Sequence, residues 1–396
     1  MNLLPQASGT RPRVACEIMP QGVVAARSTD AAAPLAAVAR VALAEGAVAP
    51  SLKPGNIVDR VAVTAAIRGA LEQIGERPNT RDANLTLVIP DSAVRVLLLD
   101  FEALPARAAE ALPLVRFRLK KLLPFDADEA MVTYQAMSTS KSIVRVLAVA
   151  IPRDVLSEYE TAAREAGFEP GAVLPSTLAC LAALEDDEPS LLINANPMGV
   201  TVAIVRGGVL LLHRSVDLQE RATIMATPLA GLPLPEVPLP ALPLVDVHET
   251  AGEWAAQQPL PEHGRNPYAD QLAGEAAVQS INDITRLDPP PVYTGGEANV
   301  GASDLQPVPL SAEIAQAVSV AAAYFEDTLA IAPTQLLSAG SLGAEKLGQI
   351  LKYSGVGNED GLRVRELVET AALLPEAVSA SAPRPWLSGV VGALRG

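Results

Sequence analysis

Cysteine, histidine and aromatic side chains are scarce in this 396-residue sequence. It contains two cysteines, Cys16 and Cys180, and three histidines, and the aromatic residues make up only 3% of it. Neither cysteine lies in a CxxC pair or beside a histidine, and the histidines lack metal-ligand spacing, so we expect no metal site. Both cysteines should be buried, reduced thiols of a cytoplasmic protein. With few aromatics, the cores must be built from Ala, Leu and Val.

Basic residues and long apolar runs are also in short supply. The chain has 30 Lys and Arg against 45 Asp and Glu, a formal net charge of −15. An acidic surface repels phosphate backbones, so nucleic acid is not expected as a partner. No uncharged apolar run reaches about 18 residues, and no basic region precedes an apolar N-terminal stretch. We therefore expect a soluble protein whose membrane association, if any, is peripheral.

Signatures of hydrolytic catalysis are missing as well. The sequence has no Gly-x-Ser-x-Gly elbow, and its histidines lie in or beside linker-like sequence. We expect no catalytic residues. The length instead predicts two or three domains, and 49% hydrophobic residues suffice for their cores.

A short motif occurs twice, half a chain apart. Residues 17–26 read EIMPQGVVAA and residues 194–203 read NANPMGVTVA. Aligned without gaps, they share a Pro, a Gly two residues later and the apolar run that follows. Each follows a short apolar strand, and Pro and Gly at these places predict a tight turn between two strands. Two such hairpins indicate a duplicated α/β fold with a cleft between its halves.

Hydrophobic periodicity predicts the remaining elements. Strands are expected at 14–18, 23–27, 85–89, 93–101, 131–136, 142–151, 191–194, 199–205, 209–213, 335–338 and 362–367. Helices are expected at 56–74, 106–123, 153–166, 173–184, 311–330 and 343–353. Residues 31–49 are Ala-rich and fit neither period clearly.

Proline marks a different kind of sequence in the second half. Residues 217–309 are rich in Pro, which removes backbone donors and blocks helices, so we expect a linker or insertion there. A short helix around 268–287 would interrupt it. Residues 1–12 are expected to form a flexible tail.

The C-terminal residues 386–394 form an apolar stripe. Helical spacing places four residues on one face: Leu387, Val390, Val391 and Leu394. The stripe could dock on a membrane surface, but such stripes more often pack back on their own domain.

One concentrated basic patch stands out in an otherwise acidic chain. It consists of Arg116, Arg118, Lys120 and Lys121. It could face anionic headgroups or an acidic partner, and a solvated helix face is the simpler alternative.

The segment 89–135 contains several short motifs in a distinctive order. They are IPDSAVR at 89–95, RFRLKK at 116–121, LPFD at 123–126 and VTYQ at 132–135. Together with the hairpins and the C-terminal helix, they resemble the PilM-like family of type IV pilus assembly proteins, in the actin-like superfamily. The resemblance covers most of 12–215 and 310–396.

This resemblance implies an α/β, actin-like (ribonuclease H-like) duplicated two-domain fold with an inserted α+β subdomain and a long Pro-rich insertion. Domain I would span 13–190, with the inserted subdomain at about 90–150. Domain II would span 191–374 around the insertion, and 375–396 would return to domain I as a helix.

The family binds ATP with two phosphate hairpins and a Gly-rich adenosine turn, and here each part is altered. Glu17 stands where the family has Asp, and Asn194 replaces the second Asp. Loss of that carboxylate weakens Mg²⁺ binding. Met19 and Asn196 replace glycines and would crowd the phosphates.

Some of the residues that the resemblance assigns to the nucleotide site remain. They are Gly22 in the first hairpin, Gly199 and Thr201 in the second, and Gly340 and Gly343 in the adenosine turn, which reads SAGSLG at 338–343. The resemblance therefore implies a degenerate nucleotide site in a protein that is not an enzyme. No cofactor is required, although ATP with Mg²⁺ remains an option.

The resemblance also implies a partner, the cytoplasmic tail of a PilN-like inner-membrane protein. That tail carries a segment similar to Asn2-Leu3-Leu4-Pro5 of this chain. We hypothesise that these four residues can occupy the partner groove. The function expected is a cytoplasmic scaffold of a type IV pilus or type II secretion-like machine at the inner face of a bacterial inner membrane. The alternatives are an ATP-binding switch of that machinery and a membrane-docked, polymer-forming actin homologue.

Overall fold

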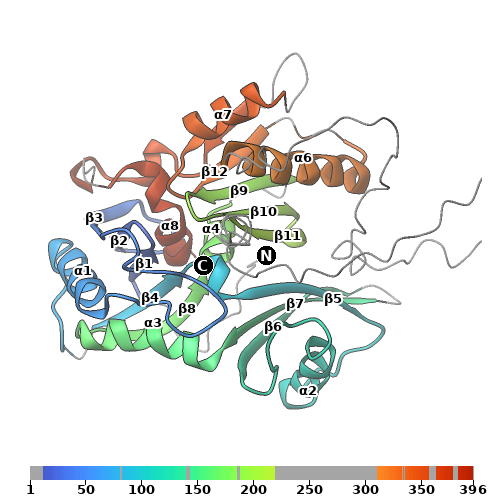
Figure 1. The fold of residues 1–396 in the computed structure, drawn as a ribbon, viewed down its shortest axis with the longest axis horizontal. Helices are drawn as coiled ribbons and strands as arrows, with labels where there is room; N and C mark the ends of the chain where they lie inside the picture. The colour runs from blue at the N-terminus through green and yellow to red at the C-terminus, as the bar shows by residue number, and fades with distance from the viewer. Residues whose placement is uncertain are drawn as a thin grey trace, which may run out of the picture. The chain divides into compact units, whose positions relative to one another are not determined.

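Two five-stranded sheets with matching strand orders form the frame of the protein (Figure 1). The first has the order β3-β2-β1-β4-β8, with bounds Leu35–Ala42, Gly22–Ser28, Val14–Met19, Asn84–Ile89 and Glu169–Pro175. The second has the order β11-β10-β9-β12-β13, with bounds Val209–Asp217, Gly199–Arg206, Ser190–Asn196, Gln335–Ala339 and Arg363–Glu366.

The computed structural model describes residues 12–80, 83–139, 143–184, 188–218, 310–331, 333, 335–355, 363–377 and 382–395. All of them belong to one unit of the chain, which comprises 1–227 and 306–396. The expected Pro-rich insertion from residue 219 onwards, its helix at 268–287 and the segment Asn2 to Pro5 lie outside the described residues.

The two sheets are duplicates in pairing as well as in order. In each, the first strand pairs antiparallel with the next and parallel with a later strand: β1 with β2 and β4, and β9 with β10 and β12. The registers match too, because Glu17 lies opposite Val24 and Asn194 lies opposite Thr201. The alignment of the two sequence motifs is therefore confirmed in space.

Helices fill three layers around the two sheets. Alternate residues of each strand point to opposite faces, so Cys16 and Ile18 share a core with α1 (Arg60–Gln73) and α3 (Arg153–Glu165). The outer face of the second sheet packs on α6 (Leu310–Leu329) and α7 (Ala344–Tyr353). Between the sheets, α4 (Ser176–Leu181) and α8 (Ser388–Arg395) share one core with Ala15 and Leu192.

A smaller α+β layer is inserted after β4. It contains β5 (Arg95–Phe101), α2 (Ala108–Leu119), β6 (Ala130–Thr139) and β7 (Val144–Pro152), with the sheet order β5-β7-β6. Its own core joins Val115 and Leu119 of α2 to Val146 of β7. Figure 1 shows α2 on one side of this sheet.

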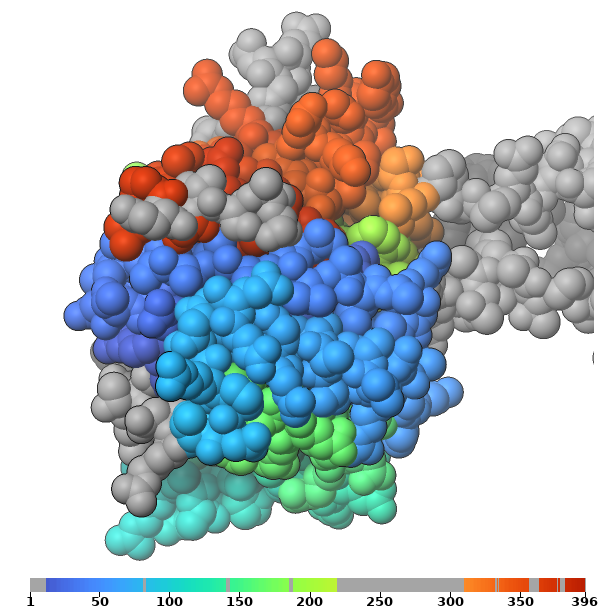
Figure 2. All heavy atoms as spheres, turned by 90° about the vertical axis from the view of Figure 1, so that its left-hand side faces the viewer, coloured from blue at the N-terminus to red at the C-terminus, as the bar shows by residue number. Residues whose placement is uncertain are grey.

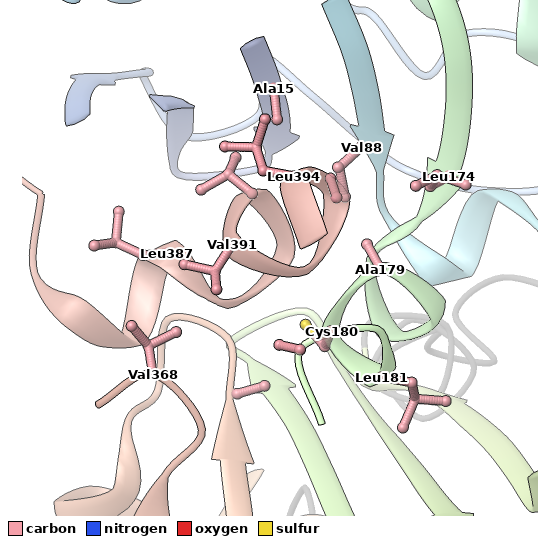
Figure 3. Packing of buried hydrophobic residues seen from close by; sticks show 14 of the residues in the cluster. Ala15, Val88, Leu174, Ala179, Cys180, Leu181, Val368, Leu387, Val391 and Leu394 are labelled. Atoms are coloured by element: carbon pink, nitrogen blue, oxygen red, sulfur yellow. The ribbon is translucent and has the colours of Figure 1, made fainter. Parts of the chain in front are cut away.

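The C-terminal helix is buried. Leu387, Val390, Val391 and Leu394 are at most 3% exposed, and Figure 3 shows α8 surrounded by side chains of β1, β4 and α4. Gly389 and Gly392 allow this approach, since a Cβ on Gly389 would collide with the Glu17 carboxylate and a Cβ on Gly392 would lie 1.8 Å from the carbonyl oxygen of Ala179. The apolar stripe thus packs inside the protein and is not available to a membrane surface.

The C-terminal segment also covers the edge of the first sheet. Leu373 forms a parallel bridge with Leu35 of β3, and the backbone N–H of Leu374 donates to the Leu35 carbonyl at 3.1 Å. In Figure 2, C-terminal segments in orange and red adjoin the blue N-terminal ones. An exposed edge strand is thereby shortened.

Two sequence-based expectations differ from the structure. The helix expected at 173–184 is strand β8 up to Pro175, and only the following residues are helical. The ambiguous stretch 31–49 contains strand β3, because pairing with β2 outweighs the helix preference of alanine. The other predicted strands and helices in the described residues are present, with shifts of a few residues at their ends.

No helix in the described ranges is long and apolar enough to cross a membrane.

Candidate functional site

Polar side chains converge between the sheets, where β1 and β9 approach their ends. Glu17 shares the inward face of β1 with Ala15, and Asn194 shares that of β9 with Leu192. Glu17 is 3% and Asn194 5% exposed. Strand alternation therefore aims both equivalent residues of the duplicated hairpins into the same interior space.

A chain of hydrogen bonds joins these two residues. The Ser176 hydroxyl donates to Glu17 Oε1 at 2.7 Å and accepts from Asn194 Nδ2 at 3.1 Å. The same Nδ2 lies 3.0 Å from Thr177 Oγ1 and 3.3 Å from Asp91 Oδ2. Because an amide nitrogen has only two hydrogens, these acceptors share it.

Asp91 is held from the other side by the start of α4. Its Oδ1 accepts from the Thr177 backbone N–H at 3.0 Å, and its Oδ2 accepts from the Thr177 hydroxyl at 2.5 Å. A carboxylate at the first turn of a helix satisfies orphan N–H groups there. The network thus ties β4, α4 and both sheets into one polar cluster.

Burial changes the acidity of the groups in this cluster. Loss of solvation raises the pKa of Glu17 from 4.5 to about 7, the Ser176 hydrogen bond opposes the rise, and the charge of Asp91 adds to it. Burial also raises the pKa of the thiols of Cys16 and Cys180. Both thiols are free and buried, as the sequence predicts.

The turn of the second hairpin is closed by its own side chain. Asn196 Oδ1 accepts from the backbone N–H groups of Met198, at 2.8 Å, and of Gly199, at 3.1 Å. Across the strands, Thr201 Oγ1 lies 2.6 Å from Ser215 Oγ. Two backbone donors of this turn are therefore already used.

The space left among these groups is small. The cavity has a volume of about 40 Å³, enough for a few water molecules, whereas sites for small organic ligands typically measure about 300 Å³ or more. Its lining comes from both sheets and includes Met19, Asp91, Asn196 and Ser341. Within the described residues, no group of three or more His, Cys, Asp or Glu side chains could hold a metal ion.

The structure brings together five of the seven residues assigned to a nucleotide site. Those that line the cavity are Glu17, Asn194, Gly199, Thr201 and Gly340. Gly340 has a φ of +82°, and a Cβ there would lie 2.5 Å from Asn194 Oδ1 and from the Ala195 carbonyl oxygen, so only glycine fits.

The other two glycines lie outside the cavity lining. Gly22 begins β2, and a Cβ there would meet the Val41 carbonyl oxygen at 2.6 Å. Gly343 precedes α7 with a φ of +78°. Both positions are explained by the turns they form.

Sequence reasoning missed Asp91, Ser176 and Thr177 as members of the cluster. A signal exists: β4 and β8 are parallel neighbours that end alike, in Ile89-Pro90-Asp91 and Leu174-Pro175-Ser176, with Ile89 paired to Pro175. Polar residues after the ends of adjacent parallel strands meet at one edge of the sheet.

The basic patch lies apart from this cluster, on α2 and the turn that follows it. Arg116 Nη1 donates to the Ala127 carbonyl at 2.5 Å, and Lys120 pairs with Asp128 at 2.5 Å. Arg118 and Lys121 are exposed. The four residues therefore divide into two with internal contacts and two that face outward.

The two duplicated sheets, with helices on their outer faces and between them, define an actin-like fold. No protein-family model matches the chain, and no curated protein matches it. Among solved structures, it is similar to a chain of the PilM–PilN type IV pilus biogenesis complex, with a TM-score of 0.61, 15% identity and coverage of 97% of this chain and 98% of that one.

Two further solved structures show weaker similarity. The ethanolamine utilization protein EutJ from Carboxydothermus hydrogenoformans has a TM-score of 0.41 at 10% identity, covering 100% of this chain and 95% of that one. The cytoplasmic domain of EpsL, an inner-membrane component of the type II secretion system of Vibrio cholerae, has 0.35 at 14%, covering 60% and 86%.

Proposed function

We propose that this protein is an actin-like scaffold of a type IV pilus or type II secretion-like machine, which binds the cytoplasmic tail of a PilN-like inner-membrane protein and does not depend on ATP. The fold shared with a chain of the PilM–PilN complex supports the class of machine. The hydrogen-bonded cluster between the sheets supports the independence from ATP.

The observation that carries the proposal is that the protein's own side chains hydrogen-bond to one another where the resemblance expects a nucleotide. Asn196 Oδ1 takes the N–H groups of Met198 and Gly199, which a phosphate would need. The bridge from Glu17 through Ser176 to Asn194 joins two residues that the resemblance assigns to a nucleotide site, and the cavity that they line measures about 40 Å³. This arrangement supports a function that does not need Mg-ATP.

The electrostatics support the same proposal. A carboxyl group organises Mg²⁺ only in its ionised form, and burial raises the pKa of Glu17 to about 7. Asn194, at the equivalent position of the second hairpin, carries no charge. The cluster therefore favours a rigid connection between the two halves over a nucleotide-driven opening.

Calorimetric titration with Mg-ATP tests the proposal. We expect no heat of binding up to about 1 mM ligand, which corresponds to an affinity weaker than about −4 kcal/mol. The affinity of a fluorescent PilN-like tail peptide should also be the same with and without Mg-ATP. Micromolar ATP binding, or a tail affinity that changes with ATP, would instead favour the switch.

The N-terminal segment offers a second, separable proposal. Asn2, Leu3, Leu4 and Pro5 lie outside the described residues, and they match the tail segment that a PilN-like partner would offer. A short apolar peptide with one polar anchor can fill a preformed groove. We expect a variant lacking residues 1–8 to bind the tail peptide more tightly than the full chain, and equal affinities would contradict this proposal.

A further inference from the structure

Helix α2 carries exposed apolar side chains on its outer face. Phe117 is 67% and Leu114 is 44% exposed, whereas Val115 and Leu119 on the opposite face are fully buried in the core of the inserted layer. Exposing an aromatic ring to water is unfavourable, and the sequence has only five phenylalanines. This face therefore has features of a contact surface.

Two basic side chains extend the same face. Leu114, Phe117, Arg118 and Lys121 are spaced at i, i+3, i+4 and i+7, which places them on one side of the helix and the turn that continues it. Arg118 and Lys121 are exposed, and neither makes an ion pair within the described ranges. We call these four residues the α2 face.

The remaining basic residues of the patch have internal roles. Arg116 Nη1 donates to the carbonyls of Ala127, at 2.5 Å, and Ala130, at 3.2 Å. Lys120 is neutralised by Asp128. These contacts fix the turn after α2 and leave the two outward cations beside the exposed ring.

We propose that the α2 face docks directly on an anionic lipid surface. Phe117 and Leu114 would enter the headgroup boundary, with Arg118 and Lys121 beside the lipid phosphates, the arrangement expected of an interfacial amphipathic helix. Charge complementarity identifies the partner: Arg118 and Lys121 attract an anionic surface, whereas the rest of a protein with a net charge of −15 is repelled by it. This contact goes beyond tail binding, which needs no lipid.

Vesicle co-sedimentation of the full-length protein tests the proposal. We compare vesicles of phosphatidylcholine alone with vesicles containing about 30% phosphatidylglycerol, at low and at physiological salt. Binding is expected to the anionic vesicles only, and to weaken as salt rises. Each basic residue near such a surface contributes roughly a fivefold increase in binding, so R118E/K121E should lower binding by at least about 25-fold.

The apolar half of the face is tested by L114S/F117S, which should also lower binding to anionic vesicles. The matched control is K352E/Y353S at the end of α7, where Tyr353 is 89% exposed next to Lys352. This variant reverses one exposed charge and removes one exposed aromatic ring away from α2, and it should bind like the wild type. Thermal unfolding checks that all variants are folded.

The outcomes separate this proposal from the proposed scaffold function. The lipid contact is wrong if the wild type binds neither kind of vesicle or binds both equally. It is also wrong if K352E/Y353S lowers vesicle binding as much as R118E/K121E does. If R118E/K121E weakens tail-peptide binding and leaves vesicle binding unchanged, the face serves a protein and the proposal also fails. A failure of tail binding alone bears only on the scaffold.

Discussion

Glu17 of β1 and Asn194 of β9 are joined through a single atom, the hydroxyl oxygen of Ser176. This oxygen lies 2.7 Å from Glu17 Oε1 and 3.1 Å from Asn194 Nδ2. The two residues occupy equivalent positions of the duplicated hairpins, so the pseudo-symmetry of the fold brings them to one point. One is an acid and the other an amide, so one accepts from the Ser176 hydroxyl while the other donates to it, and the bridge is complete.

The raised pKa of Glu17 predicts how stability depends on pH. Its pKa is about 7 in the folded state and 4.5 ordinarily, so between these values the folded state binds more protons than the unfolded state. Stability should therefore fall as pH rises from about 5 to 8, by on the order of 3 kcal/mol from this group. Glu17→Gln has no proton to lose and should become more stable than wild type as pH rises. Urea unfolding at pH 5 and pH 8 measures the difference.

A surface acid supplies a control of opposite sign. The Arg60 guanidinium holds the pKa of Glu165 below its ordinary value, so its contribution to stability is present above that value and is lost as pH falls. Glu165→Gln should thus cost stability at pH 8 and less at acid pH. A Glu17→Gln effect that is equal at pH 5 and pH 8 would contradict the raised pKa.

Asn194→Asp tests whether the cluster tolerates a carboxylate at this position. The substitution removes the Nδ2 donor to Ser176 and Thr177 and places a third carboxyl group beside Glu17 and Asp91. We expect a loss of about 2–4 kcal/mol at pH 8 and a smaller loss at pH 5, where protonation relieves the repulsion.

Denaturant unfolding measures this loss, with Asn84→Asp as the matched control. Asn84 is an exposed residue at the start of β4, and its substitution should change stability by less than about 0.5 kcal/mol. If Asn194→Asp is as harmless as Asn84→Asp, the hydrogen-bond network does not hold the two halves together.

The hairpins could be predicted from sequence because their determinants are local. Pro20 with Gly22 and Pro197 with Gly199 define tight turns, and the strands around them are apolar. The predicted helix at 173–184 includes the end of strand β8, whose Pro170 and Pro175 hide the strand pattern because proline disfavours strands as well as helices. Strand β8 lies at the edge of its sheet, beside β4 only, where missing N–H groups are tolerated.

Only some residues of the polar cluster could be predicted from the sequence. The resemblance indicated Glu17 and Asn194, yet Asp91 and Ser176 enter through the parallel pairing of β4 with β8, which joins residues more than 80 positions apart. The similar ends of the two strands, at Pro90-Asp91 and Pro175-Ser176, indicate these residues only when the pairing is already known. The protonation of Glu17 likewise depends on burial under α8, near the end of the chain.

Asn196 should stabilise the second hairpin through its side-chain oxygen. Asn196→Ala loses the acceptor for the N–H groups of Met198 and Gly199, and we expect it to cost about 1 kcal/mol. Asn196→Asp keeps the acceptor and should retain most of the stability. Chemical unfolding of the wild type and the two variants measures these free energies. An equal loss of stability in Asn196→Ala and Asn196→Asp would show that the side-chain acceptor contributes nothing.

The tightest packing contact of the C-terminal helix gives the last prediction. A Cβ on Gly392 would lie 1.8 Å from the Ala179 carbonyl oxygen and 2.7 Å from its carbon. The backbone of Ala179 cannot make room for this Cβ unless α8 moves away from α4. Gly392→Ala should therefore destabilise the protein by about 3 kcal/mol or more. The matched control is Gly69→Ala in α1, where a Cβ meets only a Val41 methyl group at 3.8 Å and alanine favours the helix by about 1 kcal/mol. Thermal unfolding should thus shift in opposite directions for the two variants, and a harmless Gly392→Ala would show that α8 does not pack between the sheets in solution.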